Sequence, residues 1–280
     1  MAFEYCLKNG EILPIAEAIV PLSNIEYAYG FGVYENIRVV HGKSIFLQEH
    51  LERLLKSAAT IGLAHRLTEE IMGDWIGALL KKIDADTCNL KLLLIGGKTA
   101  EEATLMILPL TPKFPDKKLF RDGVSVITAE HERFLPHAKT LNMLPSYLLY
   151  KKAKATGSYD ALLVDRNGNL TEGTGTNLLA LRGRTIVSPP IKDILEGVMR
   201  GSVLRVAKEQ GFEYAEEQIA LKNISSYDGF FLTSTSIKIL PINRIDETAV
   251  SIPETLKELM KHFDVYLNKY QMPETKFQEG

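Results

Sequence analysis

A lysine, Lys139, in the segment FLPHAKTLN is the first residue in this sequence whose context suggests covalent chemistry. Most lysines in a loop before a helix are solvated charges. Lys139 differs because it stands between a predicted apolar strand and a predicted apolar helix, where a solvated charge is less expected. An apolar surrounding favours the neutral amine, which can attack an aldehyde to form a Schiff base. The context therefore suggests a lysine that binds a carbonyl compound.

An acidic residue, Glu172, lies at the end of a predicted strand in LTEGTGTNLL. Two glycines and several hydroxyl or amide side chains follow it closely. The pattern suits a polar turn between strands, and it equally suits a carboxylate held by hydrogen-bond donors. A carboxylate held in this way can keep a pyridinium nitrogen protonated, which is how a protein tunes an aromatic cofactor as an electron sink.

Three further segments have groups that bind anions. Arg53 follows Glu49 by four residues in QEHLERLLKSA, so it either forms a helix pair with that acid or reaches inward to an anion. Residues 196–201 open a predicted helix, and the free N–H groups of a helix start can bind phosphate. The hydroxyl run at 233–236 follows an apolar strand, and it either binds phosphate oxygens or completes a turn.

Composition limits the class of protein that carries these groups. The chain has 280 residues, of which 45% are hydrophobic and 24% charged, as is ordinary for a globular protein. Its 33 basic and 35 acidic residues give a net charge of -2, without the basic footprint of a nucleic-acid binder. Cys6 and Cys88 lie far apart, so we predict neither a disulfide framework nor a metal site. We see no signal peptide and no membrane span, and we expect a cytoplasmic protein.

The first part of the chain predicts mixed helices and strands. Asn9-Gly10 is a strong hairpin signal. The predicted strands are 3–7, 11–13, 33–40, 44–47, 90–95 and 103–110, and the predicted helices run from about 48 to 61 and from about 68 to 83. The segment TPKFPDKKLF, from Thr111, has two prolines and a charge run but no periodicity. We therefore place a small α+β domain at 1–112, a linker at 113–120 and a larger domain at 121–280.

The second part of the chain is richer in short strands and hairpins. We expect strands at 124–128, 161–164, 170–172, 177–181, 185–187 and 230–233, and helices at 142–155, at 197–210 and from about 253. Because strands mostly follow strands, the pattern favours an α+β fold with a mixed, barrel-like second domain over a doubly wound sheet.

Six segments, in this order, resemble the class IV (fold type IV) pyridoxal-phosphate-dependent aminotransferases. They are YGFGVYENIRV from Tyr29, EHLERL from Glu49, AKTLN from Ala138, LTEGTGTNLL from Leu170, LEGVMR from Leu195, and FLTSTS from Phe231. The resemblance covers nearly the whole chain. It implies a two-domain fold, pyridoxal 5'-phosphate as the cofactor, and a homodimer with its sites near the dimer interface.

The resemblance also implies a role for each candidate residue. Lys139 would carry the cofactor as a Schiff base and then move a proton between the substrate Cα and C4' of the cofactor. Glu172 would pair with the pyridinium nitrogen. The implied phosphate ligands are the Arg53 side chain, the backbone amides of Val198 and Met199, and the side chains of Ser234 and Thr235.

The resemblance leaves the substrate open among D-amino-acid transaminases, branched-chain transaminases and aminodeoxychorismate lyases. Branched-chain enzymes usually have a tyrosine five residues after the lysine, but this chain has Leu144 there. The run Gly32-Val33-Tyr34-Glu35 resembles the D-specific enzymes. Those enzymes usually carry a carboxylate-binding arginine where this chain has Gly96-Gly97. Another cation must then bind the carboxylate, and the candidates are Arg38, Lys91, Lys98 and Lys238, with Tyr34 and Tyr29 lining the pocket.

We expect the enzyme to transfer an amino group between a small amino acid and a 2-oxo acid. The three enzyme classes named above are ranked as follows. An atypical D-amino-acid transaminase comes first, a branched-chain L-amino-acid transaminase second, and an aminodeoxychorismate lyase third. Two other classes compete with these enzymes: a protein that binds the cofactor without turnover, and an α+β interaction protein in which every motif is coincidental.

Overall fold

A computed structural model describes residues 3–21, 23–112 and 115–271, the last without its side chain. The chain divides into two compact units, which are treated separately below. Of the described residues, unit 1 comprises 3–21, 23–112, 138–142 and 270–271, and unit 2 comprises 115–137 and 143–269. The predicted linker lies partly outside the described residues, since 113 and 114 are not among them. Residues 138–142, which hold Lys139, belong to unit 1 although unit 2 flanks them on both sides in the sequence.

Unit 1 is built on an antiparallel sheet with the strand order β2-β1-β6-β5-β3-β4. Its strands are β1 (Tyr5–Lys8), β2 (Glu11–Pro14), β3 (Gly32–Val40), β4 (Lys43–Ser44), β5 (Thr87–Ile95) and β6 (Thr104–Leu110). The predicted first hairpin forms, because Asn9 and Gly10 both adopt the positive φ that such a turn requires, at 47° and 90°.

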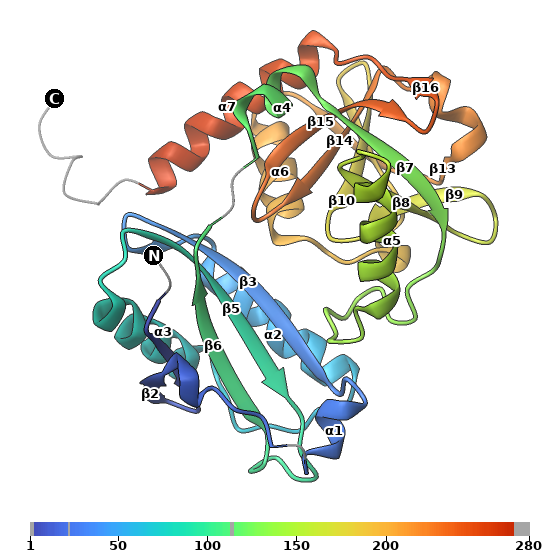
Figure 1. Ribbon diagram of the computed structural model, residues 1–280. Helices are drawn as coiled ribbons and strands as arrows, with labels where there is room; N and C mark the ends of the chain where they lie inside the picture. The colour runs from blue at the N-terminus through green and yellow to red at the C-terminus, as the bar shows by residue number, and fades with distance from the viewer. Residues whose placement is uncertain (1–2, 22, 113–114, 272–280) are drawn as a thin grey trace, which may run out of the picture. The chain divides into compact units, whose positions relative to one another are not determined.

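Two helices of unit 1, α2 (Leu47–Thr60) and α3 (Glu69–Ile83), pack on one face of this sheet (Figure 1). Alternate residues of β3, including Val33, Ile37 and Val39, join the helices in the core. Helix α3 begins as predicted, because the Thr68 side chain accepts a hydrogen bond from the backbone N–H of Ile71. A short helix, α1 (Ile25–Ala28), precedes β3.

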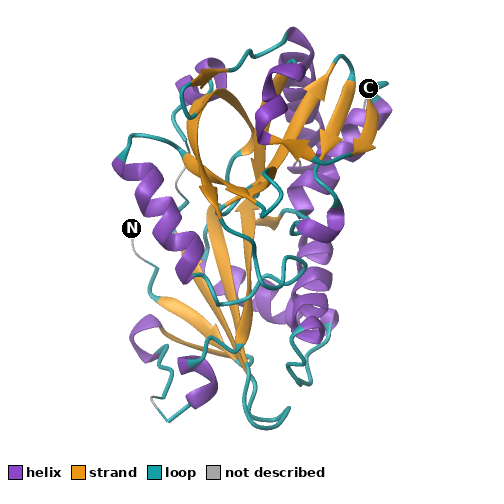
Figure 2. Ribbon diagram, turned by 90° about the vertical axis from the view of Figure 1, so that its right-hand side faces the viewer, coloured by secondary structure: helices purple, strands orange, loops and turns teal. Residues whose placement is uncertain are grey.

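Unit 2 is built on a ten-stranded sheet in the order β12-β11-β10-β14-β15-β7-β8-β9-β13, with β16 added to β15. An additional pairing between β10 and β9 joins distant members of that order, and the strands curve round on themselves (Figure 2). The strands are β7 (Val124–Glu130), β8 (Asp160–Val164), β9 (Asn169–Gly173), β10 (Asn177–Arg182), β11 (Thr185–Ser188), β12 (Glu213–Glu216), β13 (Ile219–Ala220), β14 (Gly229–Ser234), β15 (Lys238–Ile245) and β16 (Thr248–Ala249). The predicted α+β fold with a barrel-like second part is confirmed.

The helices of unit 2 lie where the sequence predicts them, with one addition. They are α4 (Lys117–Asp122), α5 (Leu144–Ala155), α6 (Val198–Glu209) and α7 (Glu254–Gln271). Helix α4 begins inside the predicted linker at 113–120 and ends two residues beyond it. Asp116 starts it, because its side chain accepts from the Lys118 N–H, and a local cap of this kind can stabilise a helix that has no apolar periodicity.

Strand β15 was missed by the sequence prediction, although it lies in the middle of the sheet. It pairs with β14 in antiparallel and with β7 in parallel orientation. Its sequence contains Pro241, and a proline argues against a central strand, which is why the pattern of residues did not indicate it.

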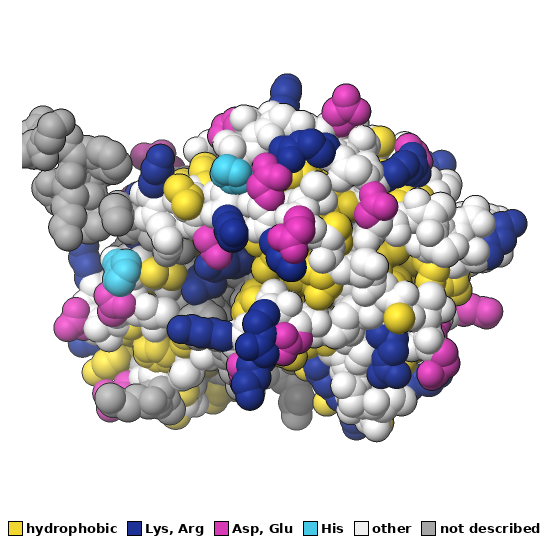
Figure 3. All heavy atoms as spheres, turned by 90° about the horizontal axis from the view of Figure 1, so that it is seen from above, with side chains coloured by type: hydrophobic (Ala, Val, Ile, Leu, Met, Phe, Trp, Pro, Cys, Tyr) yellow, Lys and Arg dark blue, Asp and Glu magenta, His cyan; other side chains and the backbone are white. Residues whose placement is uncertain are grey.

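The face drawn in Figure 3 agrees with the nearly balanced charge of the sequence. Basic and acidic side chains are interspersed on the face shown in Figure 3, without a broad patch of one sign. Among the described residues, none of the helices is both long enough and apolar enough to cross a membrane.

Candidate active site

Lys139 is held in unit 1 by a short extended segment that pairs with the first half of β3. The Lys139 carbonyl accepts from the Tyr34 N–H at 2.9 Å, and the Leu141 N–H donates to the Gly32 carbonyl at 2.9 Å. The Lys139 N–H donates to Ser57 Oγ, on α2, at 3.1 Å. These bonds fix the backbone, and they leave the Lys139 side chain half-buried with Nζ 4.6 Å from the centroid of the Tyr34 ring.

Arg53 lies on the same stripe of α2 as Ser57, one helical turn earlier. Its guanidinium forms a two-point ion pair with the Glu35 carboxylate of β3. Nε donates to Oε1 at 2.6 Å, and Nη2 donates to Oε2 at 2.8 Å. The sequence suggested Glu49 as the acidic neighbour of Arg53, but it did not indicate this pair with Glu35.

His50 completes the cluster, since its Nδ1 lies 2.9 Å from Glu35 Oε2. Burial alone would raise the pKa of Glu35, but the charge of Arg53 and hydrogen bonds from His50 and Arg53 outweigh it and lower the pKa to about 2. Burial lowers the pKa of His50 in spite of the neighbouring carboxylate. An ionised carboxylate only accepts, so a neutral His50 must carry its proton on Nδ1.

Glu172 is buried in unit 2, at 3% exposure, with donors on both oxygens. Arg133 Nη1 donates to Oε1 at 3.0 Å, and the Leu195 N–H donates to Oε2 at 3.2 Å. Asn177 Nδ2 approaches Oε2 at 3.4 Å and donates to the Leu195 carbonyl at 2.7 Å. This geometry matches the predicted carboxylate surrounded by hydrogen-bond donors. Sequence reasoning missed Arg133, whose one signal is a basic residue in the irregular stretch before Lys139.

The start of α6 lies beside Asn177, a neighbour of this carboxylate. Gly197 precedes the helix, no side-chain cap bonds to the helix start, and Val198 and Met199 are its first residues. A Cβ on Gly197 would lie only 1.9 Å from Asn177 Oδ1, so this position needs a glycine. The absence of a capping side chain suits a helix start that binds an anion.

Ser234 and Thr235 are half-buried at the end of β14, where the chain turns into β15. Their neighbour Thr233 is 1% exposed and stands opposite Asn177 in the sheet, so both side chains face the same way. Thr233 Oγ1 is buried without a hydrogen-bond partner among the described residues. Buried hydroxyls normally have hydrogen-bond partners. A ligand bound at this strand end would supply one for Thr233 Oγ1.

The candidate substrate residues have different surroundings. Tyr34 is buried, and Lys91 Nζ lies 5.8 Å from its ring centroid. Arg38 is half-buried on β3, and burial lowers its pKa. Lys238 donates to Asp264 of α7 at 2.8 Å, so it already has an acidic partner. Lys98 and Tyr29 are exposed.

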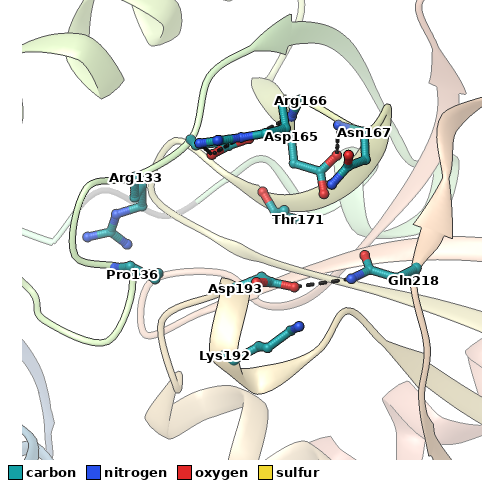
Figure 4. Close-up of a pocket in the computed structure, with 10 residues that line it drawn as sticks. Arg133, Pro136, Asp165, Arg166, Asn167, Thr171, Lys192, Asp193 and Gln218 are labelled. Carbon is teal, nitrogen blue, oxygen red and sulfur yellow. Dashed lines mark hydrogen bonds and ion pairs between the residues drawn. The ribbon is translucent and has the colours of Figure 1, made fainter.

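A polar cavity of about 260 Å³ in unit 2 is lined partly by Arg133 and Thr171 (Figure 4). Its charged lining is largely paired internally: Arg166 binds Glu132, and Gln218 binds Asp193. Arg133 connects this cavity to Glu172 through the contact described above. The cavity therefore places further charged side chains near Glu172. Because these side chains largely pair with one another, the cavity does not indicate a second ligand site.

The residues present fit pyridoxal 5'-phosphate. The set comprises a half-buried amine, a buried carboxylate with donors on both oxygens, a guanidinium, an uncapped helix start and a hydroxyl-rich strand end. These are the groups that an aldehyde, a protonated ring nitrogen and a phosphate require. Among the described residues, no cluster of histidine, cysteine and acidic side chains could hold a metal ion.

Comparison with known proteins agrees with this chemistry. Residues 32–245 match the model of the family described as amino-transferase class IV. The chain is 32% identical to a D-alanine aminotransferase of Bacillus licheniformis, over 86% of this chain and 88% of that protein. It is 30% identical to a putative branched-chain-amino-acid aminotransferase of Methanocaldococcus jannaschii, over 91% and 93% of the two chains.

A similar solved structure is a branched-chain amino acid aminotransferase with pyridoxamine 5'-phosphate. It is 25% identical to this chain, with a TM-score of 0.87, and the match covers 98% of this chain and 97% of that one. The chain belongs to the class IV aminotransferases. The expected enzyme class and the expected cofactor, pyridoxal 5'-phosphate, are thereby confirmed.

Proposed function

We propose that this aminotransferase is a D-amino-acid transaminase that uses a small D-amino acid and a 2-oxo acid. The observation that carries the proposal is Tyr34 beside Lys139, at 4.6 Å between the ring centroid and Nζ. The tyrosine usual in branched-chain enzymes is replaced by Leu144, whose side chain is 64% exposed. The D-alanine aminotransferase of Bacillus licheniformis supports the same substrate class.

The carboxylate pocket of this enzyme must differ from that of the usual D-specific enzymes. A Cβ on Gly96 would lie 2.3 Å from the Phe31 ring, and a Cβ on Gly97 would lie 2.4 Å from the Glu102 Cβ. Packing therefore excludes an arginine at either position unless its neighbours move. Arg38 and Lys91 are our first candidates for the cation that binds the substrate carboxylate, since they lie on the paired strands β3 and β5 that also carry Tyr34.

We assign the chemical roles to residues as follows. Lys139 would hold the cofactor through its aldehyde until the substrate amine displaces the lysine and frees its amine, and the cofactor would then supply an electron sink for the bond that breaks at the substrate Cα. The Lys139 amine takes up the Cα proton and delivers it to C4'. The Glu172 carboxylate holds a proton on the ring nitrogen, and Arg133 keeps that carboxylate oriented. The phosphate is bound by Arg53, by the amides of Val198 and Met199, and by Ser234 and Thr235.

A branched-chain L-amino-acid transaminase is the second candidate. Arg38 favours it, because branched-chain enzymes have an arginine at the corresponding position of the strand, and the Methanocaldococcus jannaschii relative agrees. An aminodeoxychorismate lyase is the third candidate, favoured by Lys91. We also propose that the chain forms a homodimer, which light scattering would test as a particle of twice the 31.3 kDa chain mass.

Paired enantiomers distinguish these candidates directly. The cofactor-loaded protein is mixed separately with the D and L forms of alanine, glutamate, leucine and isoleucine, and the visible absorbance of the cofactor is followed. We expect D-alanine or D-glutamate to bleach it, and 2-oxo acids to restore it. Bleaching by L-leucine and L-isoleucine alone would reject the D-specific proposal in favour of the branched-chain one.

A further inference from the structure

The cluster of Glu35, His50 and Arg53 contains more buried charge than a phosphate-binding arginine requires. The Glu35 side chain is 0% exposed, His50 is 1% exposed, and Arg53 is 11% exposed. Buried ion pairs are poor sources of stability, because desolvation offsets much of their attraction. A hydrophobic residue at position 35 would match its core neighbours Val33 and Ile37 on β3. The acid at this position therefore calls for an explanation other than packing.

The geometry of the pair gives such an explanation. A guanidinium is planar and rigid, so fixing two of its nitrogens fixes the direction of the third. Glu35 binds Nε and Nη2 of Arg53, which sets both the plane and the rotation of the group. Without that partner, the flexible arginine side chain would lose rotamer entropy each time it bound a phosphate.

His50 acts on the same carboxylate from the preceding turn of α2. Its Nδ1–H donates to Glu35 Oε2, while its Nε2 is buried without a hydrogen-bond partner among the described residues. The contact that the imidazole makes is thus directed at Glu35. His50 thus ties the Glu35 carboxylate to α2, while the same carboxylate holds Arg53.

We propose that Glu35 and His50 are positioning residues, which fix the Arg53 guanidinium in the orientation that binds the cofactor phosphate. The inference rests on the proposed role of Arg53 as a phosphate ligand, and it deepens that role. Neither Glu35 nor His50 needs to touch the cofactor. Their effect is therefore confined to ligands that carry a phosphate.

The test compares binding of pyridoxal 5'-phosphate with binding of pyridoxal, which has the aldehyde but no phosphate. Glu35→Gln keeps the size of the side chain and removes its charge. We expect the dissociation constant for pyridoxal 5'-phosphate to rise about 10-fold or more, since a charge-assisted contact is misaligned. The constant for pyridoxal should stay within about 2-fold. Glu52→Gln, an exposed acid beside Arg53 on α2, is the matched control and should change neither constant.

His50 has its own pair of variants. Asparagine at position 50 can place its Nδ2 donor close to the position of the imidazole Nδ1, whereas leucine offers no donor. We expect His50→Asn to retain most of the preference for pyridoxal 5'-phosphate over pyridoxal. We expect His50→Leu to lose it in part, with pyridoxal binding unchanged.

The outcomes separate the inference from the proposed function. An equal loss of affinity for both aldehydes in Glu35→Gln, or no loss for either, would overturn the positioning role. If Glu35→Gln does not fold, Glu35→Asp carries the same test, because it keeps the charge but shortens the reach to Arg53. An unchanged preference in a folded Glu35→Asp would then overturn it. Failure of the proposed function would show differently, as a wild-type protein whose cofactor absorbance is bleached by L-leucine and L-isoleucine alone.

Discussion

Lys139 is defined at the residue scale by fixed backbone contacts and a side chain left half-buried. Its N–H and carbonyl are bonded to Ser57 and Tyr34, so the backbone cannot drift from the Tyr34 ring. A reactive amine benefits from such fixation, because the geometry of attack is set in advance.

We predict that Lys139→Ala abolishes turnover and removes the borohydride-stable cofactor label. The substitution deletes the only atom that we assign to Schiff-base formation. Mass spectrometry of the reduced protein and a transamination assay measure the two effects. Lys151→Ala, an exposed lysine on α5, serves as the control and should behave as wild type. Normal transamination by Lys139→Ala would refute the assignment.

The Glu172 carboxylate is oriented by hydrogen bonds from Arg133 and from the Leu195 N–H. We predict that Glu172→Ala still binds the cofactor through Lys139 and the phosphate ligands but loses at least about 100-fold in rate, because the ring nitrogen loses its counter-charge. Absorbance reports binding, and single-turnover kinetics report the rate. Glu132→Gln, in the exposed pair with Arg166, is the control. A rate within a few-fold of wild type would contradict the role of Glu172.

The low pKa of Glu35 predicts a specific acid sensitivity. Its folded-state pKa is about 2, below the ordinary 4.5, so the ionised form is favoured by folding. The resulting stability is present above about pH 4.5 and is lost as the pH falls towards about 2, by up to about 3 kcal/mol. Urea unfolding at stepped pH values measures this loss. In Glu35→Gln the drop over this interval should be smaller by about that amount, and an identical pH profile in the two proteins would argue against it.

Helix α2 is the element that positions the candidate site residues of unit 1. His50, Arg53 and Ser57 lie on one stripe of this helix, and they contact Glu35 and the Lys139 segment. One amphipathic helix thus positions both the phosphate-binding candidate and the lysine backbone.

Two glycines at helix α6, Gly197 and Gly201, should change the free energy of unfolding in opposite directions when each is replaced by alanine. Gly197→Ala should weaken cofactor binding and lower the free energy of unfolding, because its Cβ would lie 1.9 Å from Asn177 Oδ1. Gly201→Ala, inside the same helix, meets nothing within 4 Å and should stabilise the protein by up to about 1 kcal/mol. Thermal unfolding and a cofactor titration of both variants measure the contrast. Similar behaviour of the two variants would mean that the close approach at Gly197 is unimportant.

Cofactor binding should be visible as stability of the whole molecule. A ligand that binds only the folded state stabilises it by about 2.7 kcal/mol at a concentration 100 times its dissociation constant. We predict that pyridoxal 5'-phosphate raises the Tm of the wild type, and that Lys139→Ala shows a smaller rise at the same concentration. Calorimetry of the two proteins measures both. An equal rise in the two proteins would indicate that the covalent bond adds nothing to affinity.

The sequence alone determined the elements whose signals are local. The Asn9-Gly10 turn, the Thr68 cap and the apolar stripe of α2 each depend on neighbouring residues, and all three are present in the structure. The sequence also predicted a chemical role for Lys139 and for Glu172, because their flanking residues form motifs that resemble a known family.

Only the tertiary structure decided which side chains became partners. Glu35 lies 18 positions from Arg53, Arg133 lies 39 from Glu172, and Ser57 lies 82 from Lys139. Such contacts depend on strand register and on how a helix packs on a sheet, and a shift of one residue would turn each side chain to the opposite face. Local patterns contain no information of that kind, so the partners of the candidate residues became visible only in the folded chain.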